Sequence, residues 1–113
     1  MLIYKIMDDA SWQAARTRGH FLGSADDLRD GFIHLSTAAQ TPGTLAKHFA
    51  GRGGLIIAAV DSAKLGAALK WDVSRGGALF PHLYEPLPAS AVVWCKPIPL
   101  RLDGVHSLPP EVV

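Results

Sequence analysis

The pattern of apolar and polar residues at the start of the chain predicts a strand followed by a helix. Residues 2–7 are mostly apolar, with β-prone Ile and Tyr, which is typical of a strand. Asp8 or Asp9 can cap a following helix, because a carboxylate accepts hydrogen bonds from the free N–H groups of a first turn. We expect this helix to end near Arg18 and to turn Trp12 toward the core.

The next segment is predicted to be a loop that leads into a short strand and a second helix. Residues 20–31 mix Gly, Ser, Asp and Arg without an apolar period, which favours a loop. Phe32 to Ser36 is predicted to be a strand. Thr41 followed by Pro42 indicates a helix start, since Pro suits the first helical turn, and Gly51 ends that helix.

The rest of the chain is predicted to consist of strands and turns. Leu55 to Val60 is apolar on both alternating faces, as expected of a strand in the middle of a sheet, and Ala68 to Val73 is a weaker strand candidate. Seven of the eight prolines follow residue 80, which disfavours helix there. Ala91 to Lys96 and Ile98 to Leu102 are predicted as two strands separated by Pro97. Together these elements predict one small α+β domain over residues 1–113.

Composition and charge narrow the classes of function. The chain is 49% hydrophobic and 19% charged with a net charge of +1, typical of a compact soluble protein. Its Lys and Arg residues are scattered, so a nucleic-acid partner is not expected, whereas a small charged ligand is compatible. No apolar run approaches the roughly 20 residues that span a bilayer, and Cys95 is the single cysteine, so we expect a cytoplasmic protein without membrane contact.

A first candidate site lies in the segment from Asp30 to Thr37. Strand side chains alternate faces, so Phe32, His34 and Ser36 are expected to point one way. An imidazole and a hydroxyl two residues apart stand about 7 Å from each other, a spacing that suits two groups of one ligand, such as a ribose diol and a neighbouring amide or phosphate. Thr37 adds a second hydroxyl.

A second candidate site lies in the segment from Phe80 to Tyr84. His82 and Tyr84 fall on one strand face by the same alternation. Two histidine-bearing strands in one small domain can bring imidazoles together, and imidazole titrates near neutrality, as acid–base chemistry requires. The alternative is an aromatic plug on an edge strand, with Phe80 covering the core and Tyr84 reaching solvent.

Other common chemistries find little support. The five histidines show no metal-ligand spacing among themselves or with Cys or carboxylates, so no metal is expected. The glycine-rich stretch at 51–54 follows a helix and precedes a strand, the reverse of the order in a phosphate-binding loop. Cys95 has apolar neighbours that would raise its pKa, which predicts a buried structural thiol. Glu85 precedes a proline, so its side chain is expected to be exposed to solvent.

The chain resembles the bacterial and plant family of domains of unknown function 952. The resemblance rests on the Tyr4 to Ile6 strand, on Trp12, on the Asp30 to Ser36 block followed by Gln40, and on the Phe80 to Tyr84 block. It implies a small split, mainly antiparallel sheet with two or three short helices, similar to the ADP-ribosyltransferase fold. In that fold a His-x-Thr or His-x-Ser pair holds a ribose hydroxyl of nicotinamide adenine dinucleotide (NAD), and His34 with Ser36 resembles it. In the 952 family a glutamate often follows the Trp near position 71, where this chain has Asp72.

Two functional hypotheses remain open. In the first, a cleft binds a nucleotide or ADP-ribose-like ligand, with NAD or ADP-ribose as the possible cofactor, and supports ADP-ribosyl or phosphoryl transfer. His34 and His82 are the candidate catalytic residues, and the candidate ligand-binding residues are His34, Ser36, Thr37, Asp72, His82 and Tyr84. In the second, the domain is a non-catalytic binding or interaction module in which His34 and His82 are structural. The sequence does not identify a protein partner.

Overall fold

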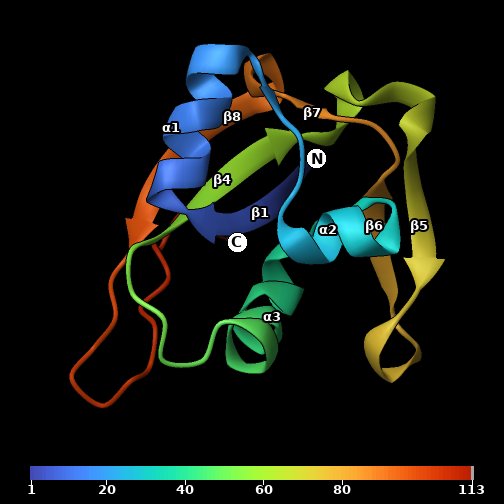
Figure 1. The fold of residues 1–113 in the computed structure, drawn as a ribbon. Coiled ribbons are helices and arrows are strands. Elements are labelled where there is room, and N and C mark those ends of the chain that lie inside the picture. Colours follow the sequence, from blue (N-terminus) through green and yellow to red (C-terminus); the bar gives the residue numbers. More distant parts are fainter. Residues whose placement is uncertain (113) are drawn as a thin grey trace.

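The strands of the protein form three small antiparallel sheets in the computed structural model, which describes residues 1–112 (Figure 1). The central sheet has the order β1 (Leu2–Asp8), β4 (Leu55–Asp61), β8 (Val92–Ile98). The second sheet has the order β3 (Ile33–His34), β6 (Leu79–Leu83), β5 (Leu69–Val73). The smallest pairs β2 (His20–Phe21) with β7 (Leu87–Pro88). The predicted mainly antiparallel α+β architecture is therefore confirmed.

Three α-helices and several short 3-10 turns connect the strands. The α-helices are α1 (Asp9–Arg18), α2 (Ala25–Asp30) and α3 (Thr41–His48). The 3-10 turns are η1 (Ala38–Gln40), η2 (Ser62–Lys64), η3 (Gly66–Ala68), η4 (Arg75–Gly77) and η5 (Ala89–Ala91). As predicted, α1 is capped by Asp8, whose carboxylate accepts from the backbone N–H of Ser11 at 2.8 Å.

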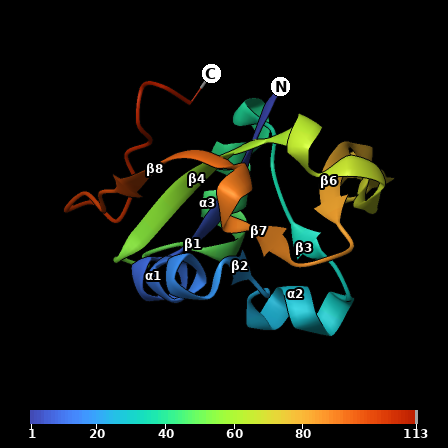
Figure 2. The same ribbon diagram turned by 90° about the horizontal axis from the view of Figure 1, so that it is seen from above.

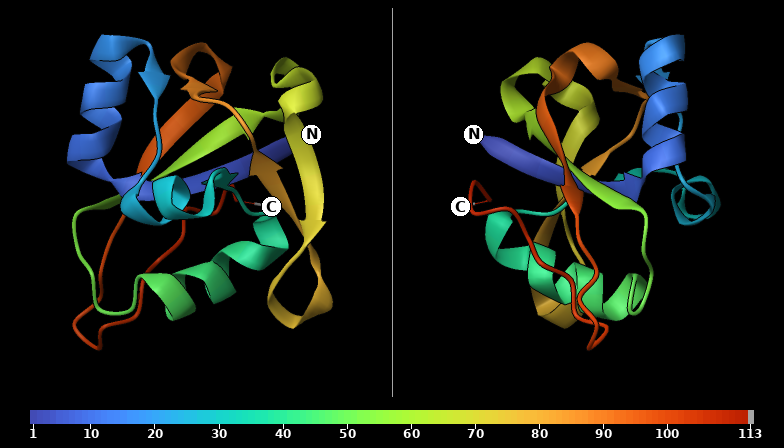
Figure 3. Two further views of the ribbon diagram at one scale, coloured as in Figure 1. Left: turned by 45° about the vertical axis from the view of Figure 1, so that its right-hand side comes forward. Right: turned by 90° about the vertical axis from the view of Figure 1, so that its left-hand side faces the viewer.

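Two helices cover opposite faces of the central sheet. Alternate residues of β1 enter separate apolar clusters, because strand side chains alternate faces. One cluster joins Ile3 of β1 to Trp12 of α1, and the other joins Tyr4 of β1 to Leu45 of α3. Two further views show α1 and α3 on the two sides of this sheet (Figure 3). The chain thereby places α3 next to the segment that follows β3.

The segment after β3 joins the two larger sheets. Leu35 still donates its backbone N–H to Pro81 of β6 at 3.0 Å, but Ser36 pairs with Tyr4 of β1 through two hydrogen bonds of 2.8 and 2.9 Å. The chain therefore passes from the β3–β6–β5 sheet to the central sheet within two residues. His34 therefore lies in the sheet that contains β6, and Ser36 lies where this sheet meets the central sheet.

The prediction of a loop over residues 20–31 was wrong. Residues 20–21 form β2, and α2 lies beside β3 (Figure 2). The helix forms because Ser24 and Asp27 make a capping box: Asp27 N–H donates to Ser24 Oγ at 3.2 Å, and Ser24 N–H donates to Asp27 Oδ2 at 2.9 Å. The strand predicted for Phe32 to Ser36 is shorter than expected, with only Ile33 and His34 in β3.

The prediction of two C-terminal strands separated by Pro97 was also wrong. β8 continues through Pro97 to Ile98, with Pro97 opposite Ile56 of β4. A proline is tolerated there because β8 is an edge strand, whose outer side needs no N–H donor. In the described residues beyond Ile98, the single strand-like pairing is an isolated bridge between Leu100 and His106. Within the described part of the chain, no helix is long and apolar enough to cross a membrane.

Candidate functional site

A cavity of about 260 Å³ lies between α2, α3 and the β3–β6 pair. It brings together three of the residues selected from the sequence, His34, Ser36 and His82, which line its wall. His34 and His82 come from separate motifs and face each other in the β3–β6 register. As expected from two histidine-bearing strands in one small domain, the two imidazoles lie close together, with ring centroids 5.5 Å apart.

His34 is held by a carboxylate at each ring nitrogen. Its Nδ1 lies 2.6 Å from Asp27 Oδ1, and its Nε2 lies 2.9 Å from Asp30 Oδ2. The backbone N–H of His34 also donates to Asp27 Oδ1 at 3.0 Å. The histidine side chain is 36% exposed, so its ring is fixed in orientation yet reaches the cavity and solvent.

Asp27 is the buried centre of this network. Its side chain is 2% exposed and forms an ion pair with Lys5, whose Nζ lies 2.9 Å from Asp27 Oδ2. Burial alone would raise the pKa of Asp27, but the hydrogen bond from His34 and the charge of Lys5 hold that pKa well below its ordinary 3.8. Burial lowers the pKa of Lys5 from 10.5, and Asp27 opposes this change. Asp27 is therefore an ionised carboxylate that orients His34.

His82 has a carboxylate partner of its own. Its Nδ1 lies 2.9 Å from Asp72 Oδ2, and the Tyr84 hydroxyl donates to the same oxygen at 2.6 Å. These two hydrogen bonds lower the pKa of Asp72 below 3.8, and the Tyr84 bond raises the pKa of Tyr84 above 10.0. His82 itself is only 4% exposed.

Phe32 forms the aromatic packing around both histidines. Its ring stacks on His82 with centroids 4.0 Å apart and planes 22° apart. It also contacts His34 at 4.6 Å and Tyr84 at 5.2 Å between centroids. This packing and the two carboxylates restrict the rotamers of His34 and His82.

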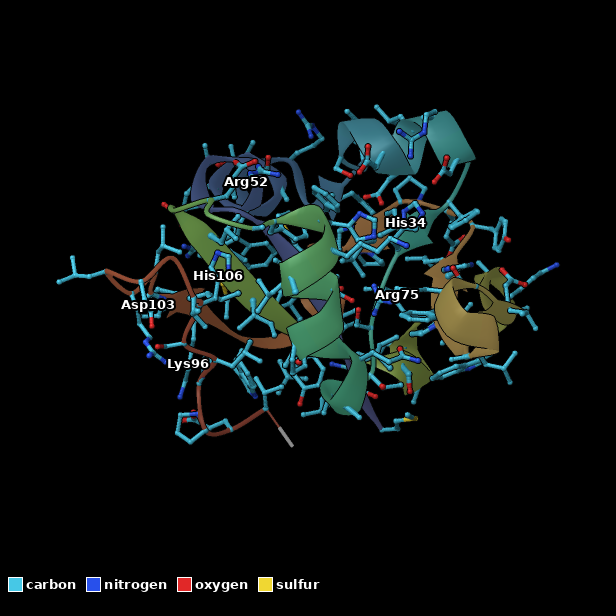
Figure 4. All side chains as sticks on the ribbon, turned by 90° about the horizontal axis from the view of Figure 1, so that it is seen from below. His34, Arg52, Arg75, Lys96, Asp103 and His106 are labelled. Carbon is cyan, nitrogen blue, oxygen red and sulfur yellow. The ribbon has the colours of Figure 1, made fainter. Side chains whose placement is uncertain are left out.

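The hydroxyl groups of Ser36 and Thr44 form the part of the cavity wall next to α3. Ser36 is 4% exposed, and its Oγ lies 2.9 Å from Thr44 Oγ1. Thr44 donates to the Gln40 carbonyl at 3.1 Å, and Arg75 of η4 donates to Thr44 Oγ1 at 3.4 Å. Figure 4 shows His34 and Arg75 on the same side of α3. Ser36 is thus connected to a cationic side chain through Thr44.

The other predicted residues do not line this cavity. Asp72 and Tyr84 support His82 from the neighbouring strand and the end of β6. Thr37 begins the turn before α3, where its backbone N–H donates to Gln40 Oε1 at 3.0 Å. These three side chains lie outside the cavity wall, and their role in ligand binding stays a prediction.

Sequence reasoning missed several residues of the cavity. Asp27 and Lys5 were not selected, nor were Lys47 and His48 of α3, which also line it. The pattern Ser24-x-x-Asp27 is a capping-box signature, so it marked a helix in a segment predicted to be a loop. No sequence signal links Lys5 to Asp27, because that pair depends on tertiary packing.

Among residues 1–112, no cluster of three or more His, Cys, Asp or Glu side chains has an arrangement that could hold a metal ion. Cys95 lies half-buried in β8, and burial, reinforced by the charge of Asp9, raises the pKa of its thiol above 9.0. The direction of this pKa agrees with the prediction, but the thiol is half-buried rather than buried as expected, because β8 is an edge strand.

The fold and the two histidine motifs define a small α+β protein of a family without an established activity. The chain belongs to the family described as "Protein of unknown function (DUF952)", which it matches over residues 6–95. The predicted family resemblance is thus confirmed. No curated protein matches the chain.

Solved structures of one bacterial protein are similar to the whole chain. A crystal structure of protein CC0527 from Caulobacter crescentus is 50% identical, has a TM-score of 0.94, and the match covers 99% of this chain and 98% of that one. A solution NMR structure of CC0527 is 53% identical, with a TM-score of 0.82 and coverage of 92% and 90%. These similarities support the fold and name no activity.

Proposed function

We propose that the cavity binds the ribose and adjoining groups of a nucleotide or an ADP-ribose-like ligand. One observation carries this proposal: His34 and His82, far apart in the sequence, are paired in register and line one cavity together with Ser36. Convergence of distant polar groups on a concave site is what a ligand requires. The resemblance to ADP-ribosyltransferases, with His34 and Ser36 in place of their ribose-binding pair, supports the same ligand class.

Asp27 prepares His34 for this role. A buried, ionised carboxylate at Nδ1 makes that nitrogen the donor and leaves Nε2 for a ligand. Asp30 now lies 2.9 Å from Nε2, but its side chain is 33% exposed and can rotate away. A ribose hydroxyl that replaces Asp30 would bond Nε2 directly, with the ring already in position.

The reaction that this ligand class allows is transfer at the ribose. With NAD as donor, the bond between ribose and nicotinamide breaks, nicotinamide leaves with the electron pair, and an acceptor oxygen bonds to the ribose carbon. The proton of the acceptor passes to water, because Nδ1 of His34 is bonded to Asp27 and its Nε2 holds the ribose hydroxyl in this proposal. In this proposal His82 does not exchange a proton; it stacks on Phe32 and so holds the site in place.

Titration of the protein with NAD and ADP-ribose, observed by amide and imidazole NMR signals, tests the proposal. The signals of His34, Ser36 and His82 should move, whereas the exposed His20 imidazole outside the cavity should not. His34→Ala should remain folded and lose these shifts. Unmoved signals at all three positions across a millimolar titration would exclude the proposal.

The alternative, a non-catalytic module with structural histidines, is favoured by one observation at His82. That side chain is almost fully buried, stacked on Phe32 and bonded to Asp72. If His82 is structural, His82→Ala should destabilise the fold by about 1–3 kcal/mol, and NAD and ADP-ribose should leave every cavity signal unchanged. A thermal melt beside the ligand titration separates the two functions.

A further inference from the structure

Two cationic side chains, Lys47 and Arg75, and the imidazole of His48 form one wall of the cavity. Lys47 and His48 come from the last turn of α3, and Arg75 comes from η4. None of the three forms an ion pair with a carboxylate in the part of the chain that the structure describes. Lys47, His48 and Arg75 are called the cationic wall below.

The two cations act on the imidazole of His48. The pKa of His48 lies below 6.5, first because of burial and then because Arg75 and Lys47 repel a proton on its ring. A protein gains no stability from gathering like charges around a concave surface. An anion bound between them would relieve this repulsion.

Arg75 is held in place rather than freely mobile. It is half-buried, and its guanidinium lies over the Phe80 ring with Cζ 4.9 Å from the ring centroid. It also donates to Thr44 Oγ1 at 3.4 Å. Gly43 permits this approach, because a Cβ at that position would stand only 3.1 Å from the Arg75 guanidinium. The side chain is therefore positioned before any ligand arrives.

The opposite wall carries a small net negative charge. Asp26, Asp27 and Asp30 of α2 line it, together with Lys5 and Arg29, which form ion pairs with these carboxylates, so three negative and two positive side chains leave one net negative charge. Carboxylates accept hydrogen bonds from hydroxyl groups but repel phosphates. The cavity is therefore negatively charged on its α2 side and positively charged on its α3 side. His34 lies on the α2 side, beside Asp27 and Asp30.

We infer that the cationic wall is a phosphate subsite and that it sets the orientation of the ligand. A sugar phosphate or nucleotide lies with its hydroxyls toward His34 and α2 and with a phosphate between Arg75 and Lys47. The orientation of the hydroxyls rests on the proposed function, whereas the phosphate subsite does not. The volume of about 260 Å³ is slightly smaller than the roughly 300–1,000 Å³ of typical ligand pockets, so the cavity holds a ribose phosphate and leaves the rest of a dinucleotide outside.

Two probes, inorganic pyrophosphate and ADP-ribose, test this inference by NMR titration and calorimetry. Both should shift the signals of Thr44, Lys47 and Arg75, and the affinity should fall as salt concentration rises. Arg75→Gln should weaken ADP-ribose binding at least about tenfold, because it removes a charged hydrogen-bond donor. The matched control is Arg18→Gln, an exposed arginine of α1 outside the cavity, which should bind like the parent protein.

Gly43→Ala tests the position of the Arg75 guanidinium without removing its charge. The added methyl group requires the Arg75 guanidinium to shift by a few tenths of an ångström, whereas Ala favours the helix more than Gly, so ADP-ribose affinity should fall modestly while the melting temperature stays the same or rises. Binding by Arg75→Gln within twofold of the parent would overturn the inference, as would unmoved α3 and η4 signals with both probes. If pyrophosphate shifts those signals and ADP-ribose leaves His34 unmoved, the phosphate subsite stands and the proposed function fails.

Discussion

His34 and His82 stand directly opposite each other in the antiparallel pairing of β3 with β6, with ring centroids 5.5 Å apart and planes at 70°. Residues opposite each other in an antiparallel pair project from the same face, so the register alone brings the two motifs together. Each ring has its own carboxylate: Asp27 for His34 and Asp72 for His82. The two histidines differ in exposure: the His34 side chain is 36% exposed, whereas His82 is 4% exposed.

Removal of the Asp27 charge is predicted to destabilise the fold strongly. Asp27→Asn leaves Lys5 buried without its ionic partner, and a buried pair that loses one member typically costs about 3–5 kcal/mol. The unfolding free energy from urea titration measures this loss. Part of it should be recovered near pH 10, because burial lowers the pKa of Lys5 and the neutral amine is easier to bury.

The control for this prediction removes both charges. In Lys5→Met with Asp27→Asn, no unpaired charge remains in the core, and the amide oxygen can still accept from the His34 backbone N–H. We expect the double variant to be more stable than Asp27→Asn alone. If Asp27→Asn costs less than about 1 kcal/mol, Lys5 and Asp27 do not form the ion pair described above.

The stability of the protein is predicted to decline in acid. Asp8, Asp27 and Asp72 have pKa values below 3.8 in the folded protein. The unfolded chain therefore binds more protons as the pH falls, so the contribution of these carboxylates is complete above 3.8 and is lost below it. Unfolding free energies measured from pH 6 to pH 2 should fall on the acid side. Asp27→Asn should flatten this decline, whereas Asp9→Asn, at an exposed position with no ion pair, should leave it unchanged.

The strands and the first candidate residues could be predicted because their signals are local. The apolar run of β4, the cap at Asp8 and the alternation that puts His34 and Ser36 on one face all depend on neighbours in the chain. The family resemblance was equally local, since it rested on two short blocks.

Most of the missed features depend on contacts between distant segments; the exception is the capping box of α2, because Ser24-x-x-Asp27 is a local signal. α2 is only six residues long and is stabilised by the burial of Asp27 against Lys5, a residue in β1. The cationic wall exists because η4 folds back against α3, where Gly43 leaves room for Arg75. Neither contact leaves a period or a motif in the sequence, so the charged walls of the cavity could not be read from it.

The hydrogen bond between Tyr84 and Asp72 is predicted to control the titration of the tyrosine. It raises the pKa of Tyr84 above 10.0 because the phenol must give up a proton that a carboxylate holds. Asp72→Asn removes that negative charge, so the pKa should fall toward 10.0. The Tyr84 ring-carbon shift followed against pH measures it. Glu111→Gln, the same change at a carboxylate of the C-terminal segment, should have no effect, and an equal fall in both variants would contradict the assignment.

Cys95 is predicted to react slowly with alkylating reagents in the folded protein. Burial raises the pKa of its thiol above 9.0, so the thiolate that attacks the reagent is scarce near neutral pH. Labelling by iodoacetamide at pH 7.5 should be at least about fivefold slower in the native protein than in urea, and the native rate should still be rising above pH 9. Mass spectrometry of quenched samples gives both rates. Equal rates in the two states would show that β8 gives Cys95 no protection, and a native rate that reaches its plateau below pH 8 would contradict the raised pKa.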